Sequence, residues 1–277
     1  MTTPPPGRQP RPESPFPAPF RALARLLLYV TGPLALYARH VVHTSRVVRT
    51  FSAEDERQAD PALLEYVAAA ERALQGIGFG APHRIVHSGS PNVSSFALLL
   101  EHPSRGDLAT VMGIRGTNAL VRPRIHSAIT YTTEFADGVV LASSNVLSVK
   151  RFPTRPRYEP ILFRDADDAL ELYRLHRCRV DERALRVPVR IRTRGATEEA
   201  RIRYQERESA EVFEHWVHCG YYRRVGEQLR PTVRDAALAT WRGLWPWRQI
   251  TDRRVARDAA AARARCDALH AGRSAPR

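Results

Sequence analysis

The spacing of apolar residues changes along the chain and separates predicted helices from predicted strands. Behind Asp60-Pro61, four apolar residues recur at helical spacing: Leu63, Val67, Ala70 and Leu74. An aspartate accepts from the first amides of a helix, and proline is tolerated in its first turn. The glycines at 76 and 78 favour an end to the pattern. The sequence therefore predicts a helix over residues 61–75.

From residue 83 onward the spacing becomes that of strands. The candidate strands are 84–87, 96–101, 108–114, 126–135 and 139–146. Asp137-Gly138 stands between two of them as a two-residue hairpin turn, and Ser104-Arg105-Gly106 forms a second tight turn. Short connections favour antiparallel pairing. We predict an α+β fold: an antiparallel β-meander of about five strands covered by the helix at 61–75, with N- and C-terminal helical extensions.

The second half of the chain reads mainly as helices. Prolines at 153, 156 and 160 indicate an extended connector, and Asp168 follows Asp165 at the start of another helix. The alternation at 186–192 contains Pro188, which leaves an edge strand or no strand. Thr197 is placed to cap a long charged helix that reaches about residue 224. A final helix, rich in alanine and arginine, is predicted over 250–269.

Four regions follow from these patterns and from composition. Residues 1–19 hold eight prolines and no sustained periodicity, so we expect a disordered tail. Residues 20–50 form an apolar and basic segment suited to a membrane interface. Residues 51–195 form the α+β core domain, and residues 196–277 form a helical, basic C-terminal region.

Net charge is concentrated at the two ends of the chain. Residues 1–50 sum to +6 and residues 221–277 to +8, whereas residues 51–220 sum to zero. Of the 43 basic residues only Lys150 is a lysine, and a GC-rich, bacterial-like genome explains that preference. Codon bias alone does not explain why the middle carries no excess charge.

Each basic end also contains an apolar segment. Residues 26–38 are uncharged and lie between Arg25 and Arg39, but a membrane-spanning helix needs about 20 apolar residues. Gly32-Pro33 favours a break at the centre. An interfacial helix therefore fits this segment best. A single-pass anchor and a helix packed on the core domain remain alternatives.

Tryptophans mark the second apolar segment. Trp241, Trp245 and Trp247 lie within seven residues and alternate with Arg242 and Arg248. Indole rings prefer the headgroup level of a bilayer because they combine an apolar ring with a polar N–H group. Packing of these rings on the hydrophobic core is the competing interpretation.

The leading hypothesis is a non-enzymatic, cytoplasmic, peripheral membrane protein with a domain that binds a protein or small molecule. Its partner would be an anionic membrane surface. The predicted interface residues are Leu26, Leu27, Leu28, Leu34, Trp241, Trp245, Trp247, Arg25, Arg39, Arg242 and Arg248.

Two other classes of function remain open. Nucleic-acid binding is the runner-up because arginine and tryptophan also suit phosphates and bases. A metal-dependent enzyme ranks third. Its candidate metal ligands share one side of a predicted helix and are Glu211, Glu214, His215 and His218. A solvated polar face is the simpler interpretation of these four residues. No nucleotide-binding or nucleophile motif occurs, so no catalytic residue and no cofactor are predicted.

The cysteines are few and far apart. Cys178, Cys219 and Cys266 form no C-x-x-C pair, and their number is odd. We therefore expect no disulfide framework and a reducing compartment.

Overall fold

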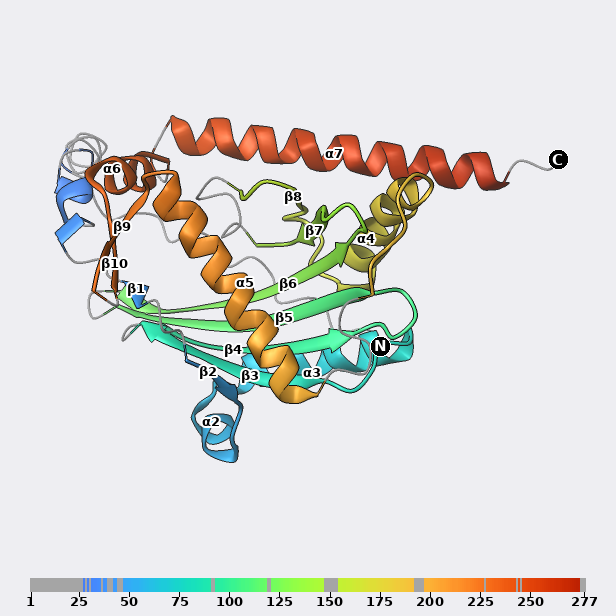
Figure 1. The fold of residues 1–277 in the computed structure, drawn as a ribbon, viewed down its shortest axis with the longest axis horizontal. Coiled ribbons are helices and arrows are strands. Elements are labelled where there is room, and N and C mark those ends of the chain that lie inside the picture. Colours follow the sequence, from blue (N-terminus) through green and yellow to red (C-terminus); the bar gives the residue numbers. More distant parts are fainter. Residues whose placement is uncertain are drawn as a thin grey trace.

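A computed structural model shows a large twisted sheet packed between helices, with a small second sheet at one end (Figure 1). It describes residues 27, 29, 31–35, 37–38, 42–43, 47–90, 93–118, 121–146, 154–191, 197–226, 228–242, 244 and 246–274. The predicted tail at 1–19 lies outside these residues.

The large sheet contains seven strands in the order β2-β3-β4-β5-β6-β7-β8. Their bounds are Val47–Thr50, His83–Ser90, Val93–Glu101, Asp107–Asn118, Val121–Glu134, Val140–Ser144 and Tyr158–Leu162. Neighbours from β2 to β7 are antiparallel, whereas β8 runs parallel to β7.

The α+β class is confirmed, but the five-strand antiparallel meander is wrong. The five predicted strands correspond to β3 to β7 and pair in chain order. Two edge strands were missed. β2 lies at the end of the segment 20–50, whose composition predicts a membrane interface and not a strand. β8 contains Pro160, which cannot donate to a ladder and made the segment look like a connector.

The hairpin between β6 and β7 shows why the middle strands were predictable. Gly138 has a φ of +79°, which the absence of a Cβ permits, and the Gly138 amide donates to the Phe135 carbonyl over 2.9 Å. The Asp137 carboxylate accepts from the Val139 amide at 3.1 Å. The Phe135 amide donates to the Val139 carbonyl over 2.9 Å, so the loop holds three residues, 136–138, and the predicted two-residue turn was one residue too short. Asp137 and Gly138 still stabilise the register of the two strands that the loop joins.

Six named helices surround the sheets. They are α2 Ala53–Gln58, α3 Pro61–Gly76, α4 Ala169–Ala184, α5 Glu198–His218, α6 Val233–Arg242 and α7 Trp247–Ser274. The N-caps of α3, α4 and α5 are Asp60, Asp168 and Thr197, as their sequences indicate. Several of the residues between 27 and 38 are helical as well.

The main core lies on one face of the large sheet. Leu74 of α3, Leu172 of α4 and Ala262 of α7 pack there with Leu98 and Val111 of the sheet. The cover therefore consists of three helices rather than the single helix that we predicted. On the opposite face, Ile202 of α5 packs near Ile85, Ala97 and Leu99, and Figure 1 shows α5 crossing in front of the strands.

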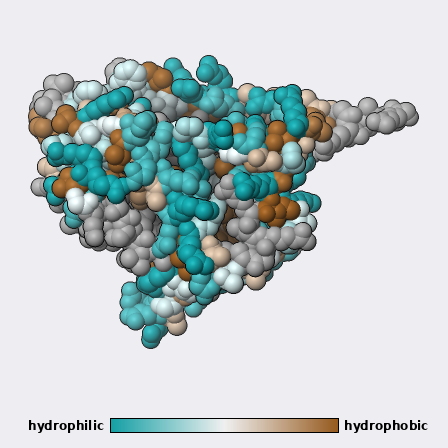
Figure 2. Space-filling model, in the orientation of Figure 1, coloured by the Kyte–Doolittle hydropathy of each residue, from teal (hydrophilic) through white to brown (hydrophobic). Residues whose placement is uncertain are grey.

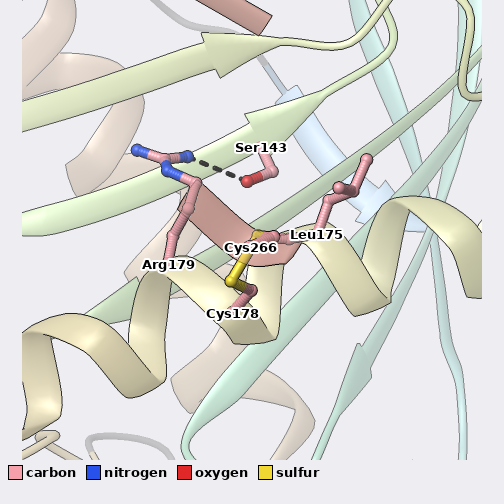
Figure 3. Close-up of a disulfide and its surroundings, with 5 residues drawn as sticks. All are labelled: Ser143, Leu175, Cys178, Arg179 and Cys266. Atoms are coloured by element: carbon pink, nitrogen blue, oxygen red, sulfur yellow. Dashed lines mark hydrogen bonds between the residues drawn. A yellow bond between two sulfur atoms is a disulfide. The ribbon is translucent and has the colours of Figure 1, made fainter. Parts of the chain in front are cut away.

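A disulfide joins two of the covering helices, which corrects our expectation from the cysteine spacing. Cys178 of α4 and Cys266 of α7 are bonded, with their Cα atoms 5.6 Å apart, as Figure 3 shows. Both are buried. Their 88-residue separation in sequence hid the pair, because only the packing of α7 on α4 brings the two helices together.

A small antiparallel sheet forms the far end of the molecule. Its strands are β1 Val42–His43, β10 Gln228–Pro231 and β9 Tyr222–Val225, in the order β1-β10-β9. Phe213 of α5 packs against Tyr222 and Leu229 there. The sheet thus connects a segment near the N-terminus with a hairpin near the C-terminus.

Candidate functional site

The two apolar end segments meet at the same end of the molecule (Figure 1). The Trp241 indole Nε1 of α6 donates to the Tyr29 carbonyl oxygen over 3.1 Å, although 212 residues separate them. A Cβ built on Gly32 would lie 2.6 Å from Thr240 Cγ2, so the N-terminal segment touches α6 at this glycine. The missing side chain at Gly32 is what allows so close an approach.

Two further contacts hold the N-terminal segment in place. The Arg223 guanidinium donates to the Tyr37 hydroxyl over 3.1 Å and lies 5.6 Å from the centre of the Tyr37 ring. Val42 pairs with Leu229 in the small sheet. The segment is therefore fixed on the β9-β10 hairpin and on α6 by backbone, aromatic and charged groups together.

Local sequence determines where α6 presents its side chains. The Thr232 hydroxyl accepts from the Asp235 amide at 3.2 Å and caps the helix directly after β10. Asp235 and Ala236 are the buried residues of α6. Val233 and Trp241 lie on the other side, because residues eight apart are about 80° apart around a helix.

Large apolar side chains are exposed at this end. The exposed fractions are 54% for Leu27, 65% for Leu34, 66% for Val233, 39% for Trp241, 52% for Trp247 and 52% for Ile250. We call these six residues the terminal surface. Figure 2 shows hydrophobic side chains among hydrophilic ones in this part of the molecule. Packing of Trp241 and Trp247 into the core, the competing interpretation, does not fit this exposure.

Arginines lie beside the terminal surface. Arg242 is exposed, and Arg248 is 3.9 Å from Asp252. On α7, Val255, Ala259 and Ala262 face inward.

The opposite side of α7 carries three exposed arginines: Arg253, Arg254 and Arg257. Within the part of the chain that the structure describes, no acidic side chain pairs with them. Their charges are therefore directed to solvent, next to Ile250.

Some predicted interface residues lie outside the described part of the chain. They are Leu26, Leu28, Trp245, Arg25 and Arg39. Of the others, Leu27 and Leu34 belong to the segment whose Tyr29 carbonyl accepts from Trp241, and Arg242, Trp247 and Arg248 follow Trp241 in the chain. Sequence reasoning missed the contributions of Val233, Ile250 and the three arginines of α7, whose helical spacing from Trp247 was the available signal.

The residues considered as metal ligands form other contacts. Glu211 accepts from Arg155 at 2.8 Å, and Glu214 is paired with Arg224. His215 Nε2 lies 3.6 Å from Cys219 Sγ, and His218 is exposed. Among the described residues, no group of three or more histidines, cysteines or carboxylates is arranged to hold a metal ion. The two carboxylates are used in ion pairs that hold α5 to its neighbours.

A second cluster, which sequence reasoning missed, lies inside the molecule. The Thr133 hydroxyl is 2.5 Å from Asp107 Oδ1 and 2.8 Å from His176 Nε2. His176 Nδ1 is 3.1 Å from the Ser143 hydroxyl, which accepts from Arg179 Nη1 at 2.9 Å. Figure 3 shows the Ser143–Arg179 contact next to the disulfide. We call these five residues the buried polar chain.

Carboxylate, imidazole and hydroxyl groups also occur in hydrolytic sites, but the buried polar chain cannot act as one. Asp107, Ser143 and His176 are 0% exposed and Thr133 is 1% exposed, so no substrate reaches them. Burial lowers the pKa of His176 to about 3, and burial lowers the pKa of Arg179 to about 10. The imidazole is therefore neutral at pH 7. The buried polar chain stabilises the fold and does not form a reaction site.

The terminal surface is consequently the candidate functional site. None of the described helices has both the length and the apolar composition to cross a membrane. Comparisons with known protein families, curated proteins and solved structures find no match to this chain.

Proposed function

We propose that this protein is a peripheral membrane protein that binds an anionic bilayer through the terminal surface. The observation that carries the proposal is the contact between Trp241 and Tyr29, which assembles exposed apolar side chains from both ends of the chain. The N-terminal segment presents Leu27 and Leu34, and the C-terminal segment presents Val233, Trp241, Trp247 and Ile250. Together they supply several large side chains at one end of the molecule.

The energies involved suit reversible binding. Full burial of a valine, leucine or isoleucine side chain contributes about 1.5–3 kcal/mol, and shallow insertion yields a part of that. Each arginine near an anionic surface adds about 1 kcal/mol. Arg242, Arg248 and the α7 arginines are placed to supply the second contribution, while Trp247 and Ile250 supply the first. Neither contribution suffices alone.

Flotation with lipid vesicles tests the proposal. We expect the protein to float with vesicles that contain phosphatidylglycerol and to remain unbound with phosphatidylcholine alone. The double substitution Trp247→Glu and Ile250→Glu places charges where insertion is required, and should abolish flotation. Leu185→Glu is the control for an added surface charge, because Leu185 is 76% exposed at the end of α4, a helix that Figure 1 shows away from α6. That variant should float like the wild type.

A second comparison separates charge from insertion. Replacing Arg253, Arg254 and Arg257 with glutamine should weaken binding to anionic vesicles. The same change at Arg174, Arg186 and Arg203, which are exposed elsewhere, removes equal charge and should have a smaller effect.

An excess of single-stranded oligonucleotide tests the alternative class of partner. Loss of vesicle binding on its addition would favour nucleic acid, and absence of flotation with either vesicle would reject the proposal.

A further inference from the structure

A cavity of about 260 Å³ lies away from the terminal surface, between α3, the β2-α2 segment and strands β3 and β4. Its apolar lining includes Phe51, Leu64, Val67, Phe96 and Leu98. An apolar cavity of about 150 Å³ takes benzene, whereas drug-sized ligands occupy about 300–1,000 Å³. The volume therefore suits one aromatic ring or one short alkyl chain.

Two aromatic rings shape the cavity. The Phe96 ring lies over Gly113, where an added Cβ would be 2.8 Å from a ring carbon. Gly113 thus lets the Phe96 ring lie close to the sheet. The Phe51 ring meets the Phe96 ring at 5.3 Å between centroids. The apolar lining is formed by side chains of α3 and of the sheet, with Phe51 closing one side.

The charged residues of the lining favour a cation. Glu56 and Glu65 are exposed, and over the described residues no hydrogen bond or ion pair engages either carboxylate. No arginine or lysine lies three or four residues from Glu65 on α3. None lies at those distances from Glu56 on α2 either. The one basic residue of the lining, Arg84, is paired with Glu71 at 3.1 Å. An incoming ammonium group would therefore find two carboxylates and no free cation.

We propose that this cavity binds a small amphipathic cation, with a single ring or short alkyl chain between Phe51 and Phe96 and an ammonium group at Glu56 and Glu65. An alcohol of the same length would gain only the apolar contacts. A carboxylate of the same length would gain those contacts and be repelled by both glutamates. The order of binding is thus amine, alcohol, carboxylate, and it does not depend on membrane binding.

Hexylamine, hexanol and hexanoate are suitable probes, because they share one chain and differ in the head group. Ligand-observed NMR titrations of the full-length protein should show hexylamine binding at least about tenfold more tightly than hexanoate, a difference that two nearby charges provide at a surface. Glu56→Gln with Glu65→Gln should remove that preference while hexanol binding stays unchanged. These exposed substitutions leave the core intact.

A filling substitution tests the location. Ala68 lines the cavity, whereas Ala69 is exposed on the neighbouring face of α3. Ala68→Phe should abolish binding of hexylamine and hexanol, and Ala69→Phe should leave both unchanged; circular dichroism verifies that each variant is folded. Equal affinity for all three probes, no binding at millimolar concentration, or unchanged binding to Ala68→Phe would overturn the proposal. Vesicle flotation of the same variants shows separately whether the terminal surface still functions.

Discussion

The terminal surface and the buried polar chain break the usual distribution of side chains in opposite ways. At the terminal surface, Leu34 and Trp247 are exposed although they are apolar. In the buried polar chain, Asp107 and His176 are inaccessible although they are polar. The polar groups inside have hydrogen-bond partners in the molecule, which explains them. The apolar groups outside lack such an explanation within the chain, and this difference is why we assign binding to the terminal surface and stability to the interior.

The largest effect should come from removing the carboxylate of the buried polar chain. Asp107 accepts from Tyr173 at 2.7 Å and from Arg177 at 3.0 Å, in addition to Thr133. Asp107→Ala leaves these donors without their acceptor, and breaking a buried ion pair costs about 3–5 kcal/mol of unfolding free energy. Urea unfolding measures the loss. Trp247→Glu, on the exposed side of the comparison, should change stability by less than about 0.5 kcal/mol; equal losses would contradict the assignment.

A somewhat smaller effect should follow from acid. The pKa of His176 is about 3 in the folded protein, with Arg177 and Arg179 adding to the effect of burial and Asp107 opposing it. An unfolded histidine titrates near 6.5, so below that pH the unfolded state binds more protons and is favoured. The stability that the neutral imidazole contributes should be complete above pH 6.5, and the free energy of unfolding should fall by up to about 2 kcal/mol between pH 6.5 and pH 5.

His176→Gln isolates this contribution. The difference in unfolding free energy between wild type and variant should narrow by up to about 2 kcal/mol between pH 7 and pH 5. Urea unfolding at pH 7, 6 and 5 measures it. A constant difference would mean that the imidazole does not stay neutral in the fold.

The smallest effect on stability should be local, where the N-terminal segment meets α6. Gly32→Ala places a methyl group against Thr240 Cγ2, and Thr240 cannot turn away freely because its hydroxyl donates to the Ala236 carbonyl over 2.8 Å. Overpacking of this kind costs about 1–3 kcal/mol. Hydrogen exchange should show faster exchange around residues 42–43 and at Trp241, with the large sheet unchanged.

Thr240→Ser provides the control for that contact. It removes Cγ2 and keeps the hydroxyl, so the double variant Gly32→Ala with Thr240→Ser should recover slow exchange. If the single variant exchanges like the wild type, or if the double variant is no better than the single one, the two ends do not pack as described.

Short sequence patterns were sufficient to predict the helices and turns that depend on neighbouring residues alone. Asp60-Pro61 marked the start of α3 because capping involves neighbouring residues. Asp137-Gly138 marked a hairpin because the Asp137 carboxylate and the positive φ of Gly138 act within the loop itself. β8 was missed because its place beside β7 depends on the path of the chain between them. No short window contains that information.

The candidate sites show the same limit. The tryptophans beside arginines were visible in sequence, but their exposure and the contact of Trp241 with Tyr29 were not, since 212 residues separate Trp241 from Tyr29. Thr133 and Ser143 lie in predicted strands and His176 lies in a predicted helix, but no motif in the sequence singled out any of the three. Only the packing of α4 on the sheet makes them interior. Ser143 and Ser144, two buried serines at the end of the otherwise apolar β7, were the one signal that pointed inward.

The most direct test of the central claim measures whether the indole rings enter a bilayer. Tryptophan fluorescence would be recorded with anionic vesicles whose acyl chains are brominated, and with ordinary vesicles of the same charge. We predict a blue shift with both and strong quenching only with the brominated chains, because Trp241 and Trp247 insert at the headgroup level. Emission that is equal in the two kinds of vesicle, while the protein is bound to both, would contradict the account.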